Sequence, residues 1–110
     1  MNTRRSSPAG GRPPIGPLEY PALRAFCRGY LHEDLPVEHG SAPEAARAFL
    51  ADASAPEREA VRDEWARLRR AAPSTRALGR ALDALGAAWR PRRRADIAGL
   101  DAVLLTPFGL

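Results

Sequence analysis

The stretch from Ser54 to Ala72, SAPEREAVRDEWARLRRAA, decides the fold class of this protein. It opens on S-x-x-E, a capping box in which the Ser54 hydroxyl accepts the N3 amide while the Glu57 carboxylate accepts the serine amide. Apolar residues then follow on one face at helical spacing: Val61, Trp65, Leu68 and Ala72. The pattern predicts a helix over residues 55–71 with one buried face.

Four more helices are predicted on similar grounds. A second S-x-x-E box at residues 41–44 opens a helix over 42–53, and Pro21 suits the first turn of an earlier helix. Ser74 can cap a helix that ends at Gly86, a residue suited to a C-terminal cap, and a last short helix covers 95–105. Each of these helices has an apolar stripe. In chain order, the stripe of the helix that begins near Pro21 is Leu23, Phe26, Cys27, Tyr30 and Leu31, and that of the helix over 42–53 is Ala45, Ala46, Phe49 and Leu50. The stripe of the helix after Ser74 is Ala77, Leu78, Ala81, Leu82 and Leu85, and that of the helix over 95–105 is Ile97, Leu100, Val103 and Leu104.

No segment alternates with period two, and residues 32–40 have no helical period and are predicted to form a loop. The fold class is therefore all-α, a compact bundle of about five helices. With 110 residues there is room for one domain. Residues 1–17, rich in Pro, Gly and Arg, are expected to form a flexible tail, and residues 18–110 a single helical domain.

The composition is 45% hydrophobic but only 6% aromatic, with alanine supplying much of the apolar count. Alanine buries little area, so the core is expected to depend on a few large side chains. These are Phe26, Tyr30, Phe49, Trp65 and Trp89.

All 17 basic residues are arginine, and the net charge of +4 is unevenly spread. Residues 1–18 hold three arginines and no acid, residues 19–72 eight arginines against ten acids, and residues 73–110 six arginines against three acids. The middle of the chain is thus slightly acidic, and the basic pI alone is weak support for nucleic-acid binding. With no secretory leader and no apolar run of membrane-spanning length, we expect a bacterial-type cytoplasmic protein.

Enzymatic and metal-binding roles find little support. One cysteine excludes an intramolecular disulfide and a cysteine-based zinc site. His32, Asp34, Glu38 and His39 lack the spacing of a known metal motif. Ser41 is accounted for as a cap, and Cys27 lies on a core stripe. We therefore expect no catalytic residue, no metal and no cofactor.

Two segments of the chain are strongly charged, and the first can be interpreted in two ways. Arg90, Arg92, Arg93 and Arg94 could contact phosphates, which makes a small nucleic-acid-binding protein the alternative function, although a charged loop between helices is favoured. The charges of the helix over 55–71 alternate in sign and predict a solvated face. They are Glu57, Arg58, Glu59, Arg62, Asp63, Glu64 and Arg67.

The segment between Tyr30 and Gly40 places acids beside two apolar residues, Leu35 and Val37. Such a patch suits a protein partner with a basic surface. Equally, the two apolar side chains can fold back over the bundle. The acids are Glu33, Asp34 and Glu38.

The segments Tyr20-Pro-Ala-Leu23 and Gly29-Tyr-Leu-His-Glu-Asp34 resemble the opening YP-L…GY-H-D pattern of a family of small helical immunity proteins, those of contact-dependent growth inhibition (CDI) systems. The similarity covers about residues 19–105. It continues through Glu38-His-Gly-Ser41, Ala46 with Phe49 and Leu50, Glu64 with Leu68, Leu85-Gly-Ala-Ala-Trp-Arg-Pro91 and the helix containing Leu100.

This resemblance implies a non-catalytic immunity-type domain that binds and neutralises the C-terminal toxin domain of the cognate effector. Such toxins are often nucleases, whose basic clefts would attract an acidic loop. The candidate toxin-binding residues are His32, Glu33, Asp34, Leu35, Val37 and Glu38, with Leu35 or Val37 as the apolar anchor. In the alternative, His32 or Tyr30 hydrogen-bonds Asp34 and the cluster holds the loop against the core. The basic ends of the chain depart from the acidic character frequent in immunity proteins.

Overall fold

The computed structural model describes residues 19–105, except for the side chain of Val37, and this part of the chain is helical without a strand. Its helices are α1 (Pro21–Tyr30), α2 (Leu35–Glu38), α3 (Ala42–Asp52), α4 (Ala55–Ala71), α5 (Thr75–Ala84) and α6 (Arg94–Leu104). The predicted all-α bundle of about five helices is confirmed, with α2 as an additional short turn. The tail expected over residues 1–17 lies outside the described residues.

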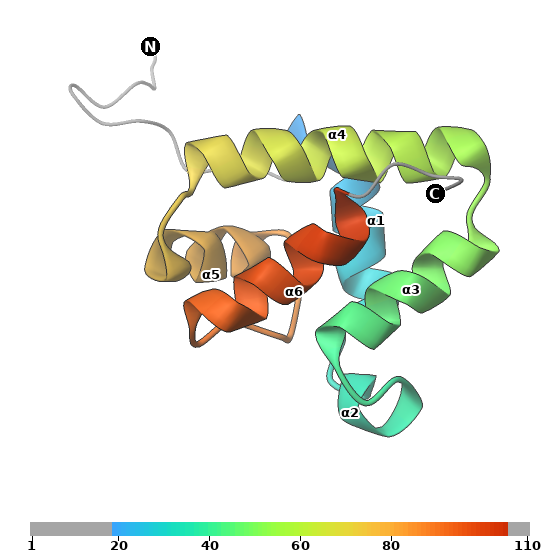
Figure 1. Ribbon diagram of the computed structural model, residues 1–110, viewed down its shortest axis with the longest axis horizontal. Coiled ribbons are helices and arrows are strands. Elements are labelled where there is room, and N and C mark those ends of the chain that lie inside the picture. The colour runs from blue at the N-terminus through green and yellow to red at the C-terminus, as the bar shows by residue number, and fades with distance from the viewer. Residues whose placement is uncertain (1–18, 106–110) are drawn as a thin grey trace, which may run out of the picture.

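The longest helix, α4, runs along one side of the molecule, and α2 lies on the opposite side (Figure 1). Helix α1 packs against α3 and α4, and α6 packs against α3 and α4. Helix α5 contacts α4 beside α6. Helices α1 and α3, far from α6 in sequence, thus share one core with it.

Serine caps begin three of the helices, α3, α4 and α5. Helix α4 has the full box: the Glu57 N–H donates to the Ser54 hydroxyl at 3.3 Å, and the Ser54 N–H donates to Glu57 Oε1 at 2.8 Å. At the start of α3 only half of the predicted box forms. The Ser41 hydroxyl accepts the Glu44 N–H at 3.3 Å, while the Glu44 carboxylate pairs with the Arg47 guanidinium.

Gly86 ends α5 as the sequence predicts. Its φ of +94° lies in the left-handed region that glycine tolerates. The N–H groups of Gly86 and Ala87 donate to the carbonyls of Asp83 and Leu82, which is the Schellman arrangement. The next amide, that of Ala88, donates to the Leu31 carbonyl at 2.8 Å and ties this turn to the end of α1.

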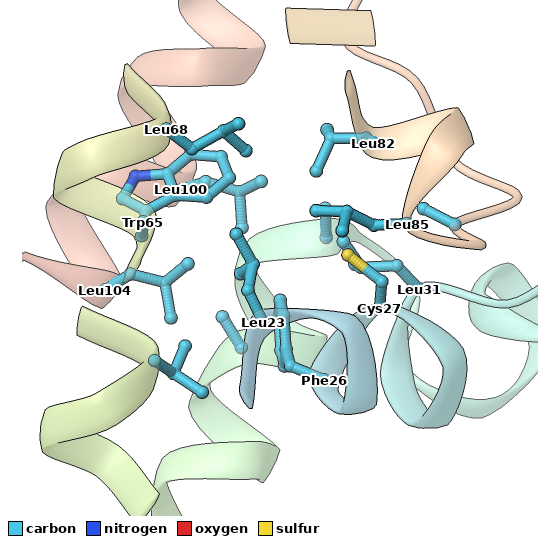
Figure 2. Packing of buried hydrophobic residues seen from close by; sticks show 14 of the residues in the cluster. Leu23, Phe26, Cys27, Leu31, Trp65, Leu68, Leu82, Leu85, Leu100 and Leu104 are labelled. Carbon is cyan, nitrogen blue, oxygen red and sulfur yellow. The ribbon is translucent and has the colours of Figure 1, made fainter. Parts of the chain in front are cut away.

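The core contains the predicted apolar stripes (Figure 2). Trp65, Phe26 and Cys27 are fully buried, and leucines of α1, α4, α5 and α6 fill the space between them. Phe49 is also buried, whereas Tyr30 and Trp89 are only partly covered and pack on the edge of the cluster. The five large side chains expected to support the core are therefore all part of it or packed against it.

Glu64 corrects one sequence prediction. The alternating charges predict that it lies on the solvated face of α4, but it is only 9% exposed. Its carboxylate accepts the N–H of Leu23 at 2.8 Å and that of Ala22 at 3.3 Å. Helix α1 has no side-chain cap of its own, so a residue of α4 satisfies its free N-terminal amides.

A second polar contact joins α4 to α6. The indole N–H of Trp65 donates to Asp101 Oδ1 at 2.7 Å. The Arg69 guanidinium makes a two-pronged contact with the same carboxylate, at 3.1 and 3.2 Å. The buried indole is thereby provided with a hydrogen-bond acceptor.

No α-helix within residues 19–105 combines the length and the apolarity that crossing a bilayer requires.

Candidate functional site

The acidic turn, residues 32–39, connects α1 to α3 and contains α2. The prediction of a loop throughout this segment is wrong for residues 35–38, which form a single helical turn. Glu33, Asp34 and Glu38 are exposed, so the negative charge foreseen from the sequence is present at the surface.

Two histidines flank the carboxylate of Glu38. His32 Nε2 lies 3.2 Å from Glu38 Oε1, and His39 Nε2 lies 3.8 Å from the same oxygen. On its other side the His32 ring accepts the Asp34 backbone N–H through Nδ1, at 3.1 Å. The predicted contact between His32 and Asp34 thus exists, but it uses the Asp34 amide instead of its carboxylate.

Leu35 is not an exposed anchor. It is 3% exposed and belongs to the hydrophobic core, and its carbonyl accepts the N–H groups of His39 and Gly40. Of the two alternatives for this residue, folding back over the bundle is the one the structure shows. The Leu35 side chain therefore presents almost no apolar surface to a partner in this structure. The side chain of Val37 lies outside the description.

Tyr30 leads from the acidic turn to a neighbouring surface. Its ring stacks with Phe26 and with His39, with centroids 5.9 and 5.8 Å away, and makes an edge contact with Phe49 at 5.6 Å. Its hydroxyl donates to Asp52 Oδ2 at 3.2 Å, not to Asp34. Partial burial, and then the hydrogen bond to Asp52, raise the pKa of the Tyr30 phenol.

A shallow groove of about 230 Å³ opens beside this tyrosine, and we call it the aromatic–acidic groove. It lies between α1, α3 and the first turn of α4. Its lining residues are Ala25, Phe26, Tyr30, Phe49, Asp52, Ala53 and Glu57. The hydrogen bonds from the Ser54 backbone and hydroxyl hold the pKa of Glu57 below its usual value, so this rim carries a carboxylate at neutral pH.

Sequence reasoning missed the groove. The sequence pattern predicts that Glu57 is a cap and a solvated charge, and it gives Asp52 no role. One sequence feature could have drawn attention to Asp52: an acid at the end of a helix, where the macrodipole disfavours negative charge. Its proximity to Tyr30, 22 residues away, depends on how α1 and α3 pack.

The arginine run joins α5 to α6 as an exposed segment, consistent with the favoured loop interpretation. Arg90 pairs with Asp83 at 3.3 Å and Arg93 with Asp96 at 3.7 Å. Asp96 also accepts the backbone N–H groups of Arg92 and Arg93 at the start of α6. Part of the positive charge of this run is thus balanced within the protein.

Neither a reactive thiol nor a metal-binding cluster is found among residues 19–105. Burial raises the pKa of the Cys27 thiol to about 12, which leaves it protonated and unreactive at neutral pH. Among residues 19–105, no three His, Cys, Asp or Glu side chains lie close enough together to hold a metal ion.

The chain matches a known protein family. The family model described as CdiI immunity protein matches residues 19–98, which contain α1 to α5, the acidic turn and the aromatic–acidic groove. Neither the comparison with curated proteins nor that with solved structures found a significant match. Since the matched residues make up most of the chain, this protein belongs to the CdiI immunity protein family.

Proposed function

We propose that this protein binds the C-terminal toxin domain of its cognate CDI effector in the cytoplasm and neutralises it by covering its active site, without catalysis. The observation that carries the proposal is the family match over residues 19–98. Exposed carboxylates beside a partly buried tyrosine support it, because complementary charge accelerates association and aromatic anchors slow release.

The acidic turn is our candidate for first contact with the toxin. Glu33, Asp34 and Glu38 are exposed, and His32 holds two of these residues in place through its ring nitrogens. A nuclease toxin would present a basic substrate cleft to these carboxylates. With Leu35 buried, the turn contributes charge more than apolar anchoring.

Growth rescue tests the function directly. The toxin domain encoded immediately upstream of this gene is expressed in a susceptible host with and without this protein. We expect restored growth and a stable complex that co-purifies. Growth arrest in both cultures, with no complex, would refute the proposal.

A matched pair of variants tests the acidic turn. Glu33→Gln with Asp34→Asn removes two charges from the turn, and Glu59→Gln with Asp63→Asn removes two from the exposed face of α4. We expect the first pair to slow association with the toxin domain by roughly tenfold at low salt, since charge acts mainly on the on-rate. The α4 pair should change it far less. Equal rates for both variants would place first contact elsewhere.

A further inference from the structure

We propose that the aromatic–acidic groove receives a lysine or arginine side chain of the toxin domain, as a second contact adjoining the acidic turn. This inference rests on the proposed function, and it names the chemistry of the group that the partner must supply. It is carried by the charge, the shape and the position of the groove.

The charge of the groove selects a cation. Asp52 and Glu57 lie on its rim, and none of the residues that line it is basic. Asp52 is the last residue of α3, where the free carbonyls carry about half a negative charge. A carboxylate at this end weakens the helix, and here it accepts the Tyr30 hydroxyl and adds its negative charge to the groove.

The shape of the groove fits a side chain. Its volume of about 230 Å³ is below the roughly 300–1,000 Å³ of small-molecule pockets. Ala25, Ala53 and Phe49 form apolar walls beside the two acids. A lysine or arginine can lay its aliphatic stem along such walls while its charged head reaches the carboxylates.

The position of the groove joins it to the acidic turn. The Tyr30 ring stacks against His39, and His39 Nε2 lies 3.8 Å from Glu38. Tyr30 also lines the groove, where its hydroxyl donates to Asp52. A single basic surface of the toxin can therefore contact both regions, with Tyr30, a residue type enriched at binding hot spots, between them.

Two isosteric substitutions test the groove while keeping its hydrogen bonds. Asn at position 52 can still accept the Tyr30 hydroxyl, and Gln at position 57 can still serve in the capping box. The Asp52→Asn, Glu57→Gln variant is compared with Glu59→Gln, Asp63→Asn, which makes the same charge change on α4. The dissociation constant for the upstream-encoded toxin domain is measured at low and physiological salt, with thermal unfolding as the check on folding.

We expect the groove variant to bind the toxin domain roughly 10- to 100-fold more weakly than the parent, because it loses a hydrogen bond between charged groups. Its affinity should also depend less on salt than that of the parent. The α4 variant should stay within about twofold of the parent. In a second variant, Ala25→Lys, this protein supplies a cation to its own groove and should also bind the toxin more weakly.

Each outcome decides a different point. A parent protein that neither rescues growth nor binds the toxin overturns both proposals. Tight binding by the parent together with unchanged binding by the groove variant overturns the groove alone. If the parent self-associates in size-exclusion chromatography with light scattering, and the groove variant does not, an arginine of a second copy is the occupant and the toxin assignment is wrong.

Discussion

Replacing Glu64 by alanine should destabilise the protein more than any change of an exposed acid on α4. The carboxylate is 9% exposed and accepts two amides of α1, with N–O distances of 2.8 Å to Leu23 and 3.3 Å to Ala22. The substitution removes both acceptors and leaves the first turn of α1 without a side-chain cap, because Tyr20 at the N-cap provides none.

The size of the effect follows from these distances. A hydrogen bond to a charged acceptor contributes about 1.5–3 kcal/mol. The 2.8 Å contact to the Leu23 N–H has the length of a strong hydrogen bond, so we assign it a contribution in this range. The 3.3 Å contact to the Ala22 N–H is long and contributes little. Alanine has a higher helix propensity than glutamate, which offsets a few tenths of a kcal/mol of the loss. We expect a loss of about 2 kcal/mol in the free energy of unfolding, which lowers the Tm by roughly 8–16 °C for a domain of this size.

Urea and thermal unfolding followed by circular dichroism measure this loss, with Asp63→Ala as the control on the neighbouring exposed position. The control should stay within about 0.5 kcal/mol of the parent. Hydrogen exchange at the amides of Ala22 and Leu23 should accelerate selectively in Glu64→Ala. A stability within 0.5 kcal/mol of the parent, with protection of these amides retained, would refute the capping argument.

Two further predictions concern the core. Asp101→Ala leaves the buried Trp65 indole N–H without its acceptor. It should lower the free energy of unfolding, measured in urea, by about 1–3 kcal/mol. An unchanged free energy of unfolding would mean that another acceptor replaces the carboxylate. Cys27 should resist iodoacetamide at pH 8 in the folded protein and react rapidly in urea. Folding raises the pKa of the Cys27 thiol from 9.0 to about 12, so the protein should lose stability as the pH rises above about 9. A Cys27→Ala variant should lose less stability over the same pH range. Equal pH profiles of stability for the two proteins would contradict the raised pKa of Cys27.

The sequence predicted the helices well because their ends are chemically local. The Ser54 box and Gly86 act within their own turns, so α4 begins and ends at the predicted residues and α5 ends at its glycine. Helix α2 was missed because four residues cannot display a helical period. Its formation depends on burying Leu35, which only the packed bundle makes possible.

The polar contacts between helices were not predictable in the same way. Glu64 stands among charges of alternating sign, which is typical of a solvated face, yet it is three residues after Val61 and four before Leu68 and so shares their buried side. The candidate site was predicted in part. The exposed acids of the turn follow from composition, but the pairing of Tyr30 with Asp52 arises from the packing of α1 on α3.

The cap supplied by Glu64 has a consequence for synthesis of the chain. Helix α1 has ten residues, too few for a stable isolated helix, and the group that completes its first turn follows 41 residues after Leu23. At translation rates of 5–20 residues per second, that delay is roughly 2–8 s. The nascent N-terminal half must therefore wait for α4, and the groove, which takes residues from α1, α3 and α4, is assembled only then. The groove is therefore complete only when α4 has packed against α1 and α3, two helices that share one core with α6.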